Sequence, residues 1–299
     1  RNTTQIMINF SKFTELQYFG QLVPMVAAFI YKLVKKHDIS SKDAAAANAV
    51  SFGTGKYNPM PLETAILYFG TTSIMFSFSI YEVFPMLINR GIPELWSFVA
   101  VTTAPLIGIL SASIIMLKSE GFKYSDIVQR FHLKQLSKWD WTVAGLTILS
   151  AIVSDVLLGA ITKRIAKIKM FEPPSFLPRV VNPNAPPTSG KSEFMGIQLK
   201  GRWDVLLIYI GVLVFNILGE EFWWRGYIYP RQELVHNKNT WIIHGALFTW
   251  FHIFWKWNLL NLWPTCTTMA WAYQNTGNLS TGIVSHYVMN GLALIPLTL

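Results

Sequence analysis

Polar and ionisable side chains interrupt several apolar segments in the last third of the chain. They are Glu220, Glu221, Arg225, His252, His286 and Asn290. Such side chains are costly inside an apolar segment and usually serve a function. A carboxylate beside a neutral imidazole can take a proton from water, and two hydrogen-bond donors can stabilise the oxyanion that forms when water attacks an amide. The set therefore indicates hydrolysis of a peptide bond without a covalent intermediate.

The first of these segments contains two adjacent carboxylates and one guanidinium. Glu221 and Arg225 are four residues apart, so they share a helix face, with the acid before the base in the favourable order. Glu220 is rotated from Glu221 by about 100° and stays free for chemistry. The alternative is a structural ion pair at a helix end, with Glu220 at the membrane interface.

The next two segments repeat the four-residue spacing. Phe248 places an aromatic ring one helical turn before the imidazole of His252. His286 and Asn290 present two hydrogen-bond donors on one face, which suits a developing oxyanion. Their structural alternatives are hydrogen-bonded packing for His252 and an interhelical polar clamp for the second pair, worth about 0.6 kcal/mol per bond. His244, two turns before His252, is expected at the level of the lipid headgroups.

Other hydrolytic chemistries find less support. Cys266 is the one cysteine, so no internal disulfide can form, and neither an acid nor a histidine lies near it in the sequence. The G-x-S-x-G motif of many serine hydrolases is absent. Two histidines and a carboxylate are a familiar zinc ligand set, but H-E-x-x-H is absent. We therefore expect no cofactor, with zinc as the alternative.

Composition indicates the elements that must position these residues. Of 299 residues, 52% are hydrophobic and 14% are charged, whereas soluble domains carry about 25% charged residues. A membrane-spanning helix needs about 20 mostly apolar residues. Residues 65–88 and 96–117 meet this requirement and form a hairpin across a short turn, and residues 142–161 are a third span. The chain is predicted to be a multi-pass membrane protein.

The remaining apolar segments are shorter. Residues 18–34 either span the membrane or lie in its interface. A helix is expected from Trp203 to about Tyr229, followed by helices over residues 241–255, 259–272 and 279–297. Segments too short to cross the membrane fit a bundle around an internal cavity. The predicted fold class is all-α, a transmembrane bundle of about 7–8 helices with a polar cavity in the C-terminal half.

We expect one integrated membrane domain in three parts. Residues 1–162 provide N-terminal membrane helices and polar loops, residues 163–202 a polar loop with Pro and Asn, and residues 203–299 the catalytic bundle. Ionisable groups inside the apolar segments of the N-terminal half are limited to Glu63, Glu82 and Asp155. The site is therefore expected in the C-terminal half.

The net charge of +9 comes from lysines and arginines between the apolar segments. Retention of cytoplasmic loops and contact with anionic membrane lipid explain this pattern better than nucleic-acid binding, because no nucleic-acid motif accompanies it. The basic residues divide equally between the two sides of the membrane, so they predict no orientation.

The three motifs together resemble those of a known family. Glu220-Glu221-x-x-x-Arg225, Phe248-x-x-x-His252 and His286-x-x-x-Asn290 occur in this order on successive apolar segments. They are similar to the motifs of the CPBP intramembrane proteases, also called the CAAX-protease and bacteriocin-processing or Abi family. The resemblance covers about residues 203–297.

The resemblance implies an intramembrane endopeptidase similar to the Ras-converting CAAX endopeptidase. The implied catalytic set is Glu220, Glu221, His252, His286 and Asn290, supported by Arg225 and Phe248. By motif, Glu220 is the general base, His252 positions the water, His286 and Asn290 bind the oxyanion, and Glu221 with Arg225 supports Glu220. The implied partner is a peptide or membrane-protein substrate, and a bacterial inner membrane is favoured. A non-catalytic peptide-binding, immunity or scaffold protein of the same fold is the alternative.

Overall fold

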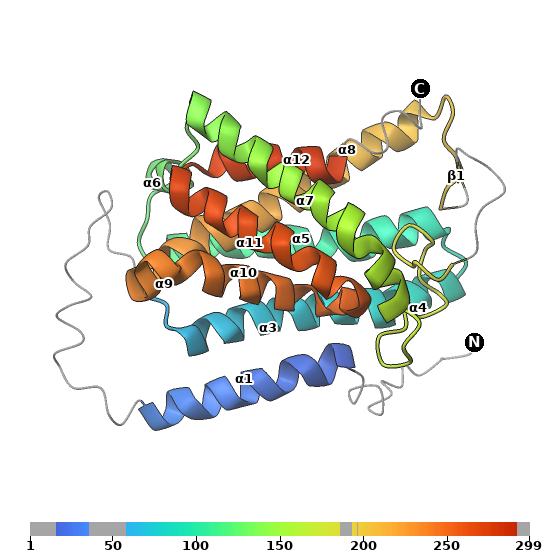
Figure 1. Ribbon diagram of the computed structural model, residues 1–299, viewed down its shortest axis with the longest axis horizontal. Coiled ribbons are helices and arrows are strands. Elements are labelled where there is room, and N and C mark those ends of the chain that lie inside the picture. Colours follow the sequence, from blue (N-terminus) through green and yellow to red (C-terminus); the bar gives the residue numbers. More distant parts are fainter. Residues whose placement is uncertain (1–15, 36–57, 186–192, 196, 292–299) are drawn as a thin grey trace.

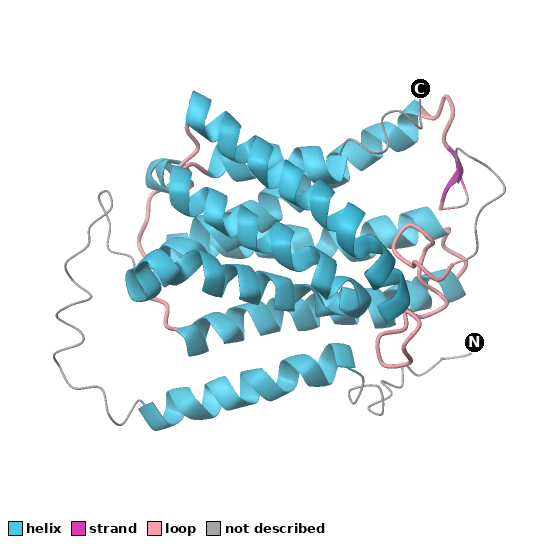
Figure 2. Cartoon of the chain, viewed as in Figure 1, coloured by secondary structure: helices cyan, strands magenta, loops and turns pink. Residues whose placement is uncertain are grey.

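Helices make up almost all of the computed structural model, which describes residues 16–35, 58–185, 193–195 and 197–291 (Figures 1 and 2). Within these residues, four helical stretches are long and apolar enough to cross a membrane: Leu62–Asn89, Glu94–Ser119, Lys138–Ile165 and Trp203–Thr276. The all-α prediction is confirmed for the described residues apart from one very short hairpin. The four stretches indicate a multi-pass membrane protein.

The N-terminal helices form antiparallel neighbours. Helix α1 (Leu16–Lys35) packs along α3 (Leu62–Phe78) and lies at one side of the bundle (Figure 1). The chain continues from α3 through a π-helical turn, Ser79–Val83, into α4 (Phe84–Asn89). A tight turn then leads into α5 (Glu94–Ser119). The predicted hairpin of two apolar helices is therefore present.

Two helices of different length follow. The short α6 (Tyr124–Arg130) was not predicted, whereas α7 (Lys138–Ile165) contains the third predicted span. Ser137 and Asp140 form a capping box at the start of α7, with Ser137 accepting from the Asp140 amide and Asp140 from the Ser137 amide. Thr281 also donates to the Asp140 carboxylate at 3.2 Å. This bond connects α7 to the last helix.

The polar loop after α7 contains the one pair of strands among the described residues. Strand β1 (Glu193–Phe194) pairs antiparallel with β2 (Ile197–Gln198). These strands are two residues long, so the hairpin does not change the helical character of the fold.

The C-terminal helices follow the predicted order, but several of their boundaries differ. In sequence they are α8 (Trp203–Glu220), a π-helical segment (Glu221–Ile228), α9 (Tyr229–His236), α10 (Thr240–Phe251), a 3-10 segment (His252–Asn258), α11 (Leu259–Thr276) and α12 (Leu279–Gly291). The helix predicted over residues 241–255 ends earlier, at Phe251. The predicted residues 292–297 of the last helix lie outside the described residues.

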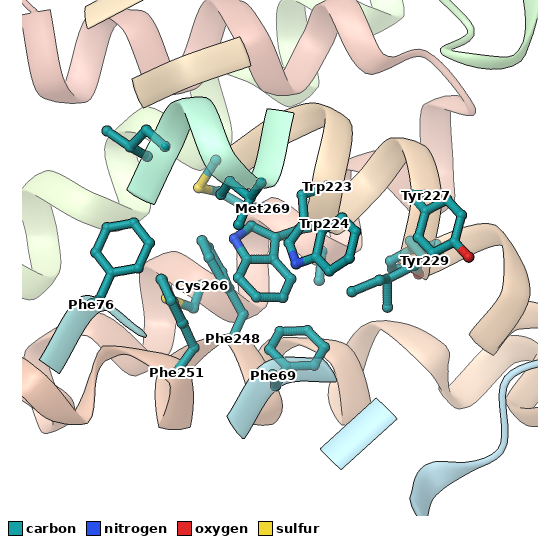
Figure 3. Packing of buried hydrophobic residues seen from close by; sticks show 14 of the residues in the cluster. Phe69, Phe76, Trp223, Trp224, Tyr227, Tyr229, Phe248, Phe251, Cys266 and Met269 are labelled. Carbon is teal, nitrogen blue, oxygen red and sulfur yellow. The ribbon is translucent and has the colours of Figure 1, made fainter. Parts of the chain in front are cut away.

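Helices from both halves of the chain interleave. Helix α10 packs against α11 and α3, α11 and α12 pack against α7, and α8 packs against α5. Buried aromatic side chains fill the space between them (Figure 3). Phe69 of α3 stacks on Trp224 at a ring separation of 4.3 Å, and Trp224 also contacts Phe248 and Phe251 of α10. Close packing of these large rings contributes to the stability of this core.

Candidate active site

Glu220 lies where the geometry of its helix changes. It is the last residue of α8, the π-helical segment begins at the next residue, and its side chain is buried. Asn216, one helical turn earlier, donates from Nδ2 to Glu220 Oε1 at 3.0 Å. π-helical turns are rare and are often found at functional sites. A buried carboxylate at this position is a candidate for chemistry.

Asn216 also connects Glu220 to the last helix. Asn290 of α12 donates from Nδ2 to Asn216 Oδ1 at 3.0 Å, and Tyr209 donates its hydroxyl to the Asn290 carbonyl. Sequence analysis did not single out Asn216, although an amide four residues before Glu220 on an apolar helix was a usable signal. The bonds fix the side chain of Asn290 relative to Glu220.

Glu221 forms a buried cluster with Arg225 and His286. Arg225 Nη1 lies 3.5 Å from Glu221 Oε1, so the predicted ion pair is present. His286 of α12 donates from Nδ1 to the same oxygen at 2.9 Å. Gly282 permits this approach, because a Cβ atom there would lie 2.5 Å from Glu221 Oε2. The Arg225 guanidinium rests over the Phe248 ring at 4.3 Å, which links the cluster to α10.

His252 is the first residue after α10. Its Nδ1 lies 2.8 Å from the Phe248 carbonyl, and a carbonyl can only accept, so Nδ1 carries the proton. In the neutral ring, Nε2 is then the acceptor. The rings of Phe248 and Phe251 lie 4.9 and 4.7 Å from the imidazole centre. Backbone and aromatic contacts together hold the ring in one orientation.

N-terminal helices stabilise the backbone that carries His252. Carbonyl groups at the end of α10 lose their helical partners. Ser73 of α3 donates to the Phe251 carbonyl, and Tyr81 donates to the Phe254 carbonyl at 2.9 Å. Ser73 in turn accepts a hydrogen bond from Gln21 of α1. The 3-10 segment is therefore stabilised by side chains outside the C-terminal motifs.

A cavity of about 200 Å³ brings most of the predicted residues together. Of the predicted set it is lined by Glu220, Phe248, His252, His286 and Asn290, whereas Glu221 and Arg225 lie behind this lining. Its other polar lining residues are Asp155, Asn258, Asn261, Thr265 and Cys266. The cavity therefore combines two carboxylates, two imidazoles and several amides.

Several lining residues lie outside the set predicted from the sequence, and Asp155 and Cys266 are two of them. Asp155 belongs to α7 in the N-terminal half, where no site was expected, and Asn261 of α11 donates to its Oδ1 at 2.6 Å. Cys266 is buried in the lining, although no acid or histidine is near it in sequence. The packing of α7 against α11 brings Asp155 into the site, and that packing has no signature in the sequence.

His244 does not belong to this cavity. It was expected at the level of the headgroups, but its side chain is fully buried in the protein core. Its Nδ1 lies 2.6 Å from Gln232 Oε1, and its ring packs against Phe69 and Tyr229 at 5.3 and 4.9 Å. The preceding α9 and the neighbouring α3 cover this face of α10, which places His244 among buried aromatic side chains.

The donor set does not fit the zinc alternative. Among the residues that the structure describes, no group of three His, Cys, Asp or Glu side chains is spaced to hold a metal ion. Glu220, His252 and His286 line one cavity, but their donor atoms do not converge as ligands of a tetrahedral site would.

Fold and site together define a class of protein: a polytopic helical membrane protein with a buried carboxylate and imidazole site. Residues 202–292 match the family model of the type II CAAX prenyl endopeptidase Rce1-like proteins. The matched segment contains all three motifs, so the family resemblance is confirmed for this part of the chain, and the family is one of peptidases. No curated protein and no solved structure matches the chain.

Proposed function

We propose that this protein is an intramembrane endopeptidase. It would hydrolyse a peptide bond of a membrane-associated or lipidated peptide or protein by attack of an activated water. The observation that carries this proposal is the shared cavity of Glu220, His252, His286 and Asn290 within membrane-length helices. The bacterial inner membrane, with its lipid around the bundle, is the location we propose.

Glu220 and His252 are proposed to activate the water. Glu220 Oε1 already accepts one hydrogen bond from Asn216, which leaves its other lone pairs available for water. His252 donates from Nδ1 to a carbonyl, so its Nε2 can accept a second hydrogen bond from the same water. A proton from the water then passes to Glu220, and the hydroxide attacks the carbonyl carbon of the substrate. As the C–N bond of the tetrahedral intermediate breaks, Glu220 returns this proton to the leaving amine.

His286 and Asn290 are proposed to stabilise the resulting oxyanion. One N–H of the Asn290 amide is bound to Asn216, and its second N–H remains available as a donor. His286 binds Glu221 through Nδ1, so Nε2–H is the donor toward the oxyanion when both ring nitrogens carry protons. Glu221 would balance the positive charge of that ring.

Glu221 and Arg225 are positioning residues in this scheme. Neither lines the cavity, and both are almost completely buried. Glu221 orients His286 through the 2.9 Å bond, while Arg225 lies beside the same carboxylate and packs on Phe248. They therefore act through His286 and Phe248 rather than on the substrate.

The proposal is tested by proteolysis in lipid nanodiscs with fluorogenic and lipidated peptides. We expect wild type and the control Glu172→Gln, on an exposed loop, to cleave. Glu220→Gln removes the base and should reduce kcat at least about 100-fold. Cleavage by Glu220→Gln at the wild-type rate would refute Glu220 as the general base. Loss of wild-type activity on adding a chelator would indicate a metal-dependent mechanism. Peptide binding without cleavage by wild type would favour the immunity or scaffold function.

A further inference from the structure

Asp155 is an acidic residue inside a membrane-length helix. It lies more than two helical turns from either end of α7. Its side chain lines the cavity and is exposed, as are the apolar side chains of Ile152 and Val156 beside it. The cavity therefore opens beside Asp155 on an apolar surface of α7.

Asp155 has no cation partner among the residues that the structure describes. Two other acids of the bundle pair with arginine: Glu221 with Arg225, and Glu120 with Arg231. In the described part of the chain, Asp155 takes part in no ion pair, and it accepts a hydrogen bond from the neutral Asn261 amide. A carboxylate at membrane depth is costly and normally pairs with an opposite charge. The cavity lining contains two carboxylates and neither lysine nor arginine.

Asn261 provides an independent sign of a ligand. It lines the cavity with only 9% of its surface exposed, and its Oδ1 atom is buried without a hydrogen-bond partner among the described residues. Unpaired buried acceptors are rare in proteins. Asn258, the residue just before α11, is followed at spacings of three and four by Asn261 and Thr265 of α11, and all three line the cavity. This face offers polar groups to a peptide backbone that has no water around it.

We propose that Asp155 is a specificity-determining residue that binds a positively charged side chain of the substrate near the scissile bond. The inference rests on the proposed endopeptidase function. Asn261 holds one carboxylate oxygen of Asp155, and the second receives the lysine or arginine of the substrate. The same negative field disfavours a substrate carboxylate in this cavity.

The test uses position-scanned fluorogenic peptides in nanodiscs, in pairs that differ only by lysine or norleucine at one position. Norleucine keeps the apolar stem and removes the charge. At one position we expect wild type to favour lysine about tenfold in kcat/KM, mainly through KM. Asp155→Asn should bring this ratio close to one. Asp204→Asn removes the same charge at the exposed start of α8 and should retain the wild-type ratio.

Three outcomes would overturn the inference. The first is that wild type shows no preference for lysine at any position. The second is that Asp155→Asn retains the wild-type preference, and the third is that Asp204→Asn loses the preference as fully as Asp155→Asn. If Asp155→Asn does not fold, the ratio of kcat/KM for the lysine and norleucine peptides is measured in wild type and in Asp155→Glu. Both proteins keep the negative charge, so both should favour lysine. If wild type cleaves no peptide, the endopeptidase proposal fails, and peptide binding is measured by fluorescence anisotropy. Tighter binding of the lysine peptide would then still support Asp155, and equal binding would refute it.

Discussion

The C-terminal helices and the N-terminal helices contribute to the cavity in different ways. Helices α8 to α12 and the segments between them carry the four residues proposed to touch the water or the oxyanion. Bonds between side chains, such as His286 to Glu221, fix three of these residues, and the Phe248 carbonyl binds His252. Helix α3 and its π-helical continuation instead bind backbone carbonyls around His252, through the hydroxyls of Ser73 and Tyr81. Helix α7 adds Asp155. The motifs therefore carry the chemistry, while helices beyond them determine the position of His252 and the charge at the opening.

The family match includes the motifs but not the N-terminal residues that contribute to the cavity. The match covers residues 202–292 and so includes every motif residue. The partners of the Phe251 and Phe254 carbonyls lie before residue 202, as does Asp155. Substrate preference can therefore differ between proteins that share the motifs, because the opening of the cavity is formed in part by a helix that the match does not include.

The largest effect is expected from Glu221→Gln. The change removes the charge that Arg225 faces in a fully buried site, and breaking a buried ion pair costs about 3–5 kcal/mol. It also removes the anion that balances a protonated His286. We expect a lower melting temperature and a kcat reduced at least about 100-fold in the variant that remains folded, with KM little changed. Thermal unfolding and proteolysis in nanodiscs measure the two effects.

Glu120→Gln is the control for that variant. Glu120 also pairs with an arginine, Arg231, and it accepts from the Tyr227 hydroxyl at 2.9 Å, but it lies outside the cavity lining. Its loss should lower stability and leave kcat unchanged. If Glu221→Gln and Glu120→Gln reduce kcat equally, Glu221 has a structural role only.

Contacts within a helix were predictable from sequence, whereas contacts between helices were not. The four-residue spacings correctly predicted that Glu221 meets Arg225 and that Phe248 meets His252. The same spacing predicted that His286 and Asn290 share a face, and both line the cavity, but it did not predict that His286 bonds to Glu221 on another helix. Spacing determines which residues share a face. It does not determine which helix that face meets.

The end of α10 shows a second limit of the sequence. Residues 241–255 are mostly apolar and contain no proline, so a single helix was predicted. The structure ends the helix at Phe251, and Trp255 has non-helical angles, φ −109° and ψ 49°. Tertiary hydrogen bonds to the Phe251 and Phe254 carbonyls accompany this end. A boundary stabilised by distant side chains leaves no local signal.

A smaller effect is expected from Gly282→Ala. A Cβ atom at this position would lie 2.5 Å from Glu221 Oε2, so α12 must shift away from the π-helical segment. Overpacking of this kind costs about 1–3 kcal/mol. The shift lengthens the His286 to Glu221 bond, so kcat should decrease about tenfold. Gly211→Ala on α8 is the control, because nothing lies within 4 Å of its Cβ position. An unchanged kcat in Gly282→Ala would show that catalysis does not depend on the close packing of α12 against Glu221.

We expect the smallest effect from Ser73→Ala. This variant tests the role of the N-terminal helices. Ser73 is fully buried and donates to the Phe251 carbonyl, so its loss leaves a buried acceptor beside His252, at about 1–3 kcal/mol. The matched control is Ser113→Ala, since Ser113 is equally buried but donates within its own helix to Leu110 at 2.7 Å. We expect Ser73→Ala alone to reduce kcat several-fold, as measured in nanodiscs. Equal kcat in the two variants would mean that the C-terminal helices position His252 without help.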